Sequence, residues 1–137
     1  DNAIYCRTGI TDQLPYGDKY WHQLAGNFKY VSCGDYGCWA IKPDNSIAFR
    51  TGVTFSYPQG TSWFDVDGSF VQLEASYQGR VYAVTSANVL YYRFGICSLH
   101  PTGSTWKQVE DLQVKHVTVG DNSLFVIATN GTIFTST

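Results

Sequence analysis

The stretch Asn45-Ser46-Ile47-Ala48-Phe49-Arg50-Thr51-Gly52 decides the fold, because it returns twice at a fixed distance along the chain. Related stretches occupy residues 2–9 and 88–95, and both keep the Arg and the Gly in register. The apolar residue of the motif recurs every 43 residues, at Ile4, Ile47, Leu90 and Ile133. A period near 40–45 residues is typical of one four-stranded blade of a β-propeller.

A loop follows each copy of this motif and carries Pro, Gly and Trp in the same order. The first loop ends in Trp21, the second in Trp63 and the third in Trp106. Turn residues before a bulky aromatic residue are typical of a connection that ends where the next strand begins. Each repeat therefore places a strand at its Trp.

Three further strands complete each repeat. A segment in which apolar and polar residues alternate, as in Val31-Ser32-Cys33, indicates a half-buried strand. The next segment, at residues 38–41, 81–84 and 124–127, is apolar without interruption and needs burial on both faces. A turn rich in Asn, Asp and Gly then leads into the strand of the opening motif. No stretch shows the period of a helix.

These patterns predict an all-β protein, and more narrowly a β-propeller with three four-stranded blades in one domain at residues 1–137. The repeats run approximately over 1–43, 44–86 and 87–129, with a closing strand at 130–137. A β-sandwich or an up-and-down barrel would also use short strands, but neither explains a motif that returns in phase.

Composition narrows the class of protein. Apolar residues make up 44% of the chain and charged residues 15%, which is typical of a packed globular protein. The formal net charge is -2 and no basic run occurs, which argues against a nucleic-acid partner. No apolar stretch approaches the roughly 20 residues of a membrane span.

The cysteines and one sequon favour a secreted protein. Cys33 and Cys38 flank four residues that are expected to form a hairpin tip, so a disulfide between them fits the cross-strand distance. Cys6 and Cys97 could pair within a subunit, between subunits or not at all. Asn130-Gly131-Thr132 is an acceptor for N-glycosylation. The start at Asp1 and the lack of Met fit a chain from which a leader has been removed.

The order Arg-x-Gly, Pro-x-Gly, Trp-x-x-(Leu/Val)-x-Gly and an aromatic strand resembles the tectonin repeat of the tachylectin and fish egg lectin families. Trp21-His22-Gln23-Leu24-Ala25-Gly26 and Trp63-Phe64-Asp65-Val66-Asp67-Gly68 follow that pattern. The third copy, at 106–111, lacks the final Gly, and the last strand, at 133–136, lacks the Arg. The resemblance implies a secreted sugar-binding propeller of about five or six blades.

Three blades do not close a ring, because propellers need about 4–8 blades. Two apolar flanks would stay exposed, so we expect a homodimer that completes a six-bladed ring. A longer chain that contains this one is the rival explanation. Residues 2–7 and 132–136 are two candidate strands for the same place, and the first could cover an edge of a partner.

The candidate ligand-binding residues lie in the loops before each Trp and at the Trp itself, because loops on a rigid scaffold carry recognition. Plain solvent-exposed loops are the alternative. The repeated Trp side chains could stack on sugar rings, although a Trp that recurs in every copy more often packs within a blade. Arg7, Arg50 and Arg93 are expected to be structural first and ligands of an acidic group second. The candidates are Tyr16, Asp18, Tyr20, Trp21, Tyr57, Gln59, Trp63, His100, Thr102 and Trp106.

The favoured function is therefore a secreted, multivalent lectin that binds cell-surface or microbial glycans, such as bacterial surface polysaccharide, in agglutination or innate defence. A non-catalytic structural or protein-binding propeller of egg, mucus or matrix is the alternative. An enzyme is not expected, because the chain has no nucleophile elbow, paired-His metal motif or phosphate loop. No cofactor is indicated and no metal ligand set can be named, although calcium held by carboxylate loops stays open.

Overall fold

The computed structural model describes residues 1–136, except for the side chains of Glu110 and Asp111; Thr137, the last residue of the expected closing strand, lies outside them. One short 3-10 turn, η1 (Tyr77–Gly79), interrupts the strands of the described chain. The strands are β1 (Ala3–Arg7), β2 (Trp21–Asn27), β3 (Tyr30–Gly34), β4 (Gly37–Ile41), β5 (Ser46–Thr51), β6 (Ser62–Ser69), β7 (Gln72–Ala75), β8 (Val81–Val84), β9 (Val89–Phe94), β10 (Thr105–Val119), β11 (Leu124–Ala128) and β12 (Ile133–Ser136).

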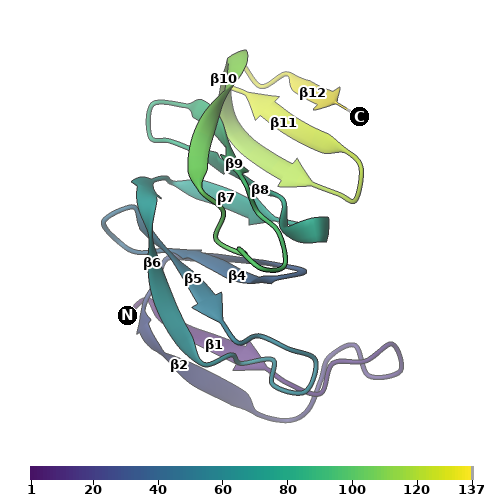
Figure 1. Cartoon of the computed structure of the whole chain (residues 1–137). Helices are drawn as coiled ribbons and strands as arrows, with labels where there is room; N and C mark the ends of the chain where they lie inside the picture. The colour runs from purple at the N-terminus through teal and green to yellow at the C-terminus, as the bar shows by residue number, and fades with distance from the viewer. Residues whose placement is uncertain (137) are drawn as a thin grey trace.

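The strands form three antiparallel sheets in chain order. The first sheet contains β1 and β2, the second β3 to β6, and the third β7 to β12. Figure 1 shows the sheets one after another from the N-terminus to the C-terminus, and within each sheet successive strands are neighbours. The expected all-β fold is confirmed, and no helix of the described chain is long and apolar enough to cross a membrane.

Strand β10 belongs to two successive units at once. Its first part, from Thr105 to Gln108, pairs with β9, and its second part, from Val114 to Val119, pairs with β11. The six-stranded sheet is thus one unit, β7–β8–β9 with the first part of β10, followed by three strands of another. In the sheets, the strand that carries the repeated Trp is the last strand of each unit. The sequence repeats instead begin near the preceding strand, which carries the Arg and Gly motif.

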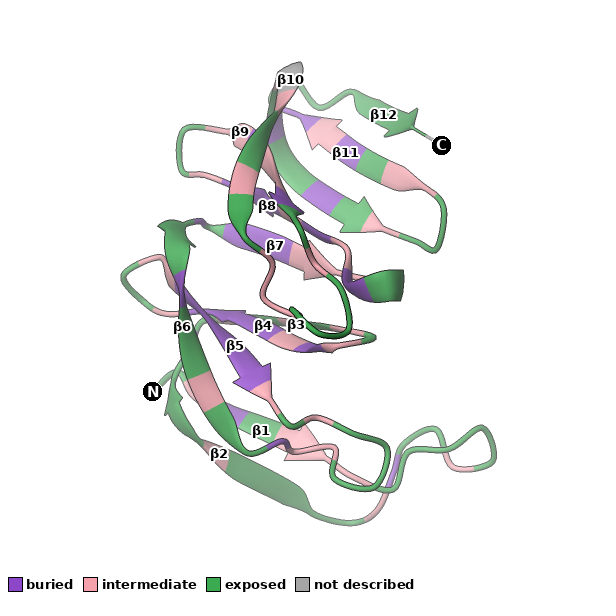
Figure 2. Ribbon diagram, viewed as in Figure 1, coloured by how far each residue is buried: buried purple, intermediate pink, exposed green. Residues whose placement is uncertain are grey.

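The uninterrupted apolar strands lie in the interior, as their sequence indicates. Trp39 and Ile41 of β4 and Val81 of β8 are at most 2% exposed, and they share one core cluster between the second and third sheets. Burying each such side chain contributes about 1.5–3 kcal/mol. Figure 2 shows this buried band along β4, β5, β7 and β8. Strand β11 differs: Phe125 is 44% exposed, because among the described residues no further unit lies against that flank.

The two ends of the described chain are exposed to solvent to different extents. All residues of β12 are exposed, including Ile133 and Phe134. At the other end, six of the seven residues of β2 are exposed, while Ile4 of β1 is buried against the second sheet. Figure 2 shows exposed residues along β2 and β12, at opposite ends of the molecule.

The predicted hairpin disulfide is present. Cys33 and Cys38 face each other across β3 and β4 and their sulfurs are bonded, with Cα atoms 4.0 Å apart. Cys6 and Cys97 carry free thiols. Cys6 lies in β1 of the first sheet and Cys97 in the loop after β9 of the third, so the chain forms no bridge between them.

Candidate ligand-binding site

The same arginine arrangement supports the loop of each repeat. Arg7, Arg50 and Arg93 donate from Nε to the carbonyl oxygens of Tyr16, Gln59 and Thr102 at 2.6, 2.9 and 2.7 Å. Each guanidinium also lies over the ring of the Trp at the beginning of the next strand, its first or second residue, at 5.1 to 5.2 Å from the ring centroid. We call this arrangement the arginine clamp. Its repetition supports the expected structural role of the arginines.

The main chain of the three loops is also the same. In the first loop, Asp18 N–H donates to the carbonyl of Thr8, and Thr11 and Leu14 exchange two hydrogen bonds. Equivalent bonds recur at residues 51–61 and 94–104. Gly17 has a φ of +71°, and a Cβ there would lie 2.5 Å from the Thr8 oxygen, so only Gly fits. The scaffold therefore presents three loops of one shape with different side chains.

The first loop gathers three of the predicted residues. Tyr16 and Tyr20 are 68% and 69% exposed and lie with Asp18 around a shallow cavity of about 390 Å³. Arg7, Leu14, Gly17 and Lys19 complete the lining. Two tyrosine rings beside a carboxylate and two cationic side chains combine apolar faces with polar groups, as ligand sites do.

The carboxylate of Asp18 is fixed by hydrogen bonds. The hydroxyl of Thr8 donates to its Oδ2, and the amide of Tyr20 donates to its Oδ1 at 3.0 Å. The Thr8 bond first, then the Tyr20 bond and the nearby His22 and Arg7, hold the pKa of Asp18 below its usual range. Asp18 is therefore an ionised acceptor at neutral pH, at a defined position between the tyrosines.

The other predicted loop residues lie on the second and third loops. Tyr57 is half-exposed at the tip of the loop between β5 and β6, and His100 is exposed between β9 and β10. Gln59 and Thr102 give their carbonyl oxygens to the arginine clamp. The ten candidates are thus divided among three equivalent loops and do not form one site.

The three Trp side chains lie at the flank of each unit. Trp63 and Trp106 donate from Nε1 to the carbonyls of Ala25 and Asp67 in the preceding unit, at 2.8 and 2.7 Å. Each also packs against a Phe ring, Phe28 or Phe70. Trp21 has no preceding unit in this chain and is 61% exposed. Trp63 and Trp106 therefore join neighbouring units.

A larger cavity, of about 580 Å³, lies between the first and second sheets, where sequence analysis predicted only Trp63. Phe28 and Trp63 form its apolar wall, and Lys42 and Asp65 form an ion pair at 2.7 Å on its rim. Arg50 lies over the Trp63 ring, and Phe28 lies 4.3 Å from it, so little of the ring is free for a ligand. The rim residues differ from one repeat to the next. That variation was the only feature of the sequence that could have indicated this cavity.

Nothing in the described part of the chain assembles a metal site, since no three His, Cys, Asp or Glu side chains converge.

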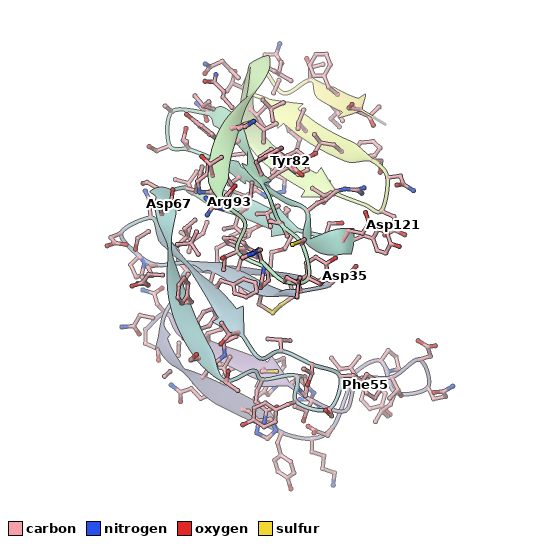
Figure 3. All side chains as sticks on the ribbon, in the orientation of Figure 1. Asp35, Phe55, Asp67, Tyr82, Arg93 and Asp121 are labelled. Atoms are coloured by element: carbon pink, nitrogen blue, oxygen red, sulfur yellow. A yellow bond between two sulfur atoms is a disulfide. The ribbon has the colours of Figure 1, made fainter. Side chains whose placement is uncertain are left out.

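The ion pair of Arg93 with Asp67, at 3.2 Å, joins two units (Figure 3). Phe55, at the tip of the second loop, is 95% exposed and points away from the sheets in the same figure.

The family of the chain follows from its sequence. The family model of the Tectonin domain matches residues 1–129, which is nearly the whole chain, so this protein belongs to the tectonin family. The expected resemblance is confirmed. No curated protein sequence matches the chain.

Solved structures show the fold at low sequence identity. Human WBSCR16 is 14% identical, with a TM-score of 0.63 over 95% of this chain and 39% of its own. YCF48 from Cyanidioschyzon merolae is 16% identical, with a TM-score of 0.56 over 90% and 44%. Prp20p from Saccharomyces cerevisiae is 13% identical, with a TM-score of 0.58 over 92% and 37%. The chain spans about two fifths of these propeller-like structures.

Proposed function

We propose that this tectonin protein is a secreted lectin that binds glycans of cell or microbial surfaces through its repeated loops. The observation that carries the proposal is the first loop, where two exposed tyrosines flank the ionised Asp18. The C–H face of a pyranose packs on an aromatic ring, and sugar hydroxyls donate to a carboxylate. The family membership supports the same function.

A shallow site of this kind binds one sugar weakly, so we propose that several loops act together. Three loops of one shape lie on one chain, and a homodimer with three blades from each chain would double that number in a six-bladed ring. Presentation of several sites raises avidity by roughly 10²–10⁴ when their spacing suits the surface. Agglutination of cells or bacteria is the activity that this arrangement supports.

The experiment is a broad glycan array with purified protein, followed by titration of each glycan that binds. Tyr16→Ala and Tyr20→Ala are each expected to weaken binding by about two- to tenfold, since aromatic stacking of this kind contributes about 0.5–1.5 kcal/mol. Tyr77→Ala, which removes an exposed tyrosine outside the three loops, is the matched control and should leave binding unchanged. Failure of the protein to bind any glycan or bacterial surface would contradict the proposal.

Secretion is part of the proposal and has its own support. The Cys33–Cys38 bridge is typical of an oxidising compartment. Asn130 is exposed in the turn before β12 and could therefore accept a glycan. A mass shift on removal of N-glycans from the protein of its native source, absent in Asn130→Gln, tests the modification.

A protein-binding propeller without catalysis is the second candidate. The observation that favours it is the apolar character of the loop tips, where Phe55 and Leu99 are 95% and 86% exposed. Such side chains are typical of anchors for a protein partner. Phe55→Ser should abolish binding in this case and leave it intact if Tyr16 and Tyr20 hold a sugar.

A further inference from the structure

A cavity of about 330 Å³ lies where β8 meets the turn between β10 and β11, at the junction of two successive units. Arg80, just before β8, and Tyr82, within it, line one side, and Asn122 and Ser123 of the turn line the other. Figure 1 shows η1 and this turn on the same side of the molecule, and Figure 3 shows Tyr82 beside β8. We call this space the Arg80 cavity. The rest of its lining is Val119, Gly120, Leu124 and Ser136.

Two residues distinguish this junction from the preceding one. Arg80 and Tyr82 follow Gly37 and Trp39 by the repeat spacing of 43 residues. At the preceding junction Trp39 is 2% exposed, and a Cβ on Gly37 would lie 2.6 Å from Cζ of Phe49, so aromatic rings fill the space there. In the next repeat a cationic side chain and a tyrosine take these two places. The cavity is therefore specific to one junction, and its lining is partly polar.

Two hydrogen bonds position the guanidinium of Arg80. Its Nη1 donates to the main-chain carbonyl of Asp121 at 2.6 Å, and its Nη2 donates to Oε1 of Gln78 at 3.3 Å. These bonds use two of the five N–H groups of a guanidinium, and the fixed fork of such a group matches the oxygens of an anion. Arg80 is thus held in place and still has donors for a ligand in the cavity.

The charge and the hydroxyl groups of the Arg80 cavity favour an anion. Arg80 is the one charged side chain in its described lining, whereas Asp121 is exposed and lies outside that lining, so water and salt screen its carboxylate. Burial, and then the nearby Tyr92, raise the pKa of Tyr82, although the charge of Arg80 opposes this shift. Tyr82 is therefore protonated at neutral pH, and its hydroxyl can donate to a ligand.

We propose that the Arg80 cavity binds a phosphate or sulfate group, either as the free ion or attached to a sugar. The guanidinium of Arg80 pairs with oxygens of that group, and Tyr82, Asn122 and Ser123 supply neutral donors for the others. Small-molecule sites in proteins measure about 300–1,000 Å³, so the volume suits a ligand the size of a sugar phosphate. None of the loop residues 8–20 lines this cavity, so the proposal is independent of the lectin function.

Isothermal titration calorimetry tests the site with three probes: inorganic phosphate, inorganic sulfate and glucose 6-phosphate. Sodium chloride at equal ionic strength is the reference. We expect saturable binding of one anion per chain. Tighter binding of glucose 6-phosphate than of inorganic phosphate indicates a group attached to a sugar, whereas equal affinities indicate that the free ion suffices. If none of the three probes binds saturably, the proposal is wrong.

Removal of the cationic group tests its role. Arg80→Gln is expected to weaken binding of the anion by about tenfold or more, because a charge-assisted pair is lost. Lys115→Gln removes the same charge from an exposed position of β10 outside the cavity, and should leave the affinity unchanged. Equal losses in the two variants would show only a general attraction between protein and anion, and would overturn the proposal.

A second variant keeps the test valid if Arg80→Gln loosens the turn. Asn122→Asp changes an exposed side chain to a carboxylate of the same shape, and should also weaken binding by about tenfold or more, because a like charge then faces the anion. In the unmodified chain, phosphate should shift the amide resonances of residues 79–82 and 119–124. Shifts confined to residues 8–20 would instead place the anion at the first loop and contradict the proposal. A negative glycan array does not affect these outcomes.

Discussion

At the scale of single residues, the arginine clamp explains why Arg and Trp recur together. The Arg side chain does two things at once: its face covers the Trp ring and its Nε holds a loop carbonyl. A lysine can approach the ring but cannot also donate in that fixed geometry. The repeat therefore depends on the guanidinium group, and not only on its charge.

Arg93→Lys and Arg50→Lys are expected to lower the free energy of unfolding by about 1–3 kcal/mol each, through loss of a hydrogen bond in a buried position. The larger loss is expected for Arg93, which also contacts Asp67, although that carboxylate is mostly exposed and its contribution is screened. Denaturant unfolding measures both. Arg80→Lys, outside the clamp, serves as control, and an equal loss there would contradict the role of the clamp.

Asp18 gives the first loop a pH dependence. Because its pKa is lowered in the folded protein, the stabilisation from its carboxylate is complete above the usual Asp range and is lost as the pH falls through the lowered folded value. We expect the loop of residues 8–20 to become susceptible to proteases below about pH 4. Asp18→Asn should remove this transition, and a transition that survives in Asp18→Asn would assign it to another group.

The sequence predicted Tyr16, Asp18 and Tyr20 as neighbours because five consecutive loop residues must lie close together. It did not predict the cavity between the first two sheets. Ala25 of β2 and Trp63 of β6 meet there across 38 residues, through the way one unit packs on the next. Repeat spacing places residues along a unit, whereas packing of unit on unit decides which side chains meet.

At the scale of elements, hydrophobic periodicity predicts where the strands lie, but it does not predict which strands share a sheet. Alternation predicted β3 and β7, and apolar runs predicted β4, β8 and β11. That β10 passes from one unit into the next, with a register shift between Gln108 and Gln113, has no sequence marker. A repeat pattern has no intrinsic starting point, so hydrogen bonding alone shows where a sheet ends.

Gln72 links the first strands of two successive units. Its amide donates to the carbonyl of Val117 at 2.7 Å and accepts from the amide of Val117 at 2.9 Å, and the side chain is almost fully buried. These two bonds satisfy the main-chain N–H and C=O of Val117 in place of hydrogen bonds from a neighbouring strand.

Gln72→Leu is therefore expected to cost about 2–5 kcal/mol, because it leaves a buried N–H and a buried C=O of Val117 without partners. Thermal and denaturant unfolding measure the loss. Gln108→Leu, the same change at an exposed site of β10, should cost less than about 0.5 kcal/mol. Equal effects of the two changes would rule out the bridging role.

At the scale of the whole molecule, the two ends of the row of units differ from its middle in how well they are covered. The complete units cover each other, and Leu73, Val81 and Ala83 are fully buried between them. The end strands lack such cover, so association should stabilise the ends most. The sequence predicted this from the number of repeats, since a row of three has two free flanks.

If a second copy covers these flanks, stability depends on concentration. Each tenfold rise in protein should then raise the apparent stability by about 1.4 kcal/mol per mole of dimer, and raise Tm with it. Differential scanning calorimetry over several concentrations measures the shift. A Tm that does not change with concentration would indicate that the single chain is the folding unit.

The identical main-chain bonds at the base of each loop have an evolutionary consequence. Since the clamp and the glycine fix the loop without help from its outermost side chains, mutations at those positions change surface chemistry and leave folding unaffected. One chain can thus present three different surfaces, and lineages should diverge fastest at residues 12–14, 55–57 and 98–100 while Arg, Gly and Trp stay constant.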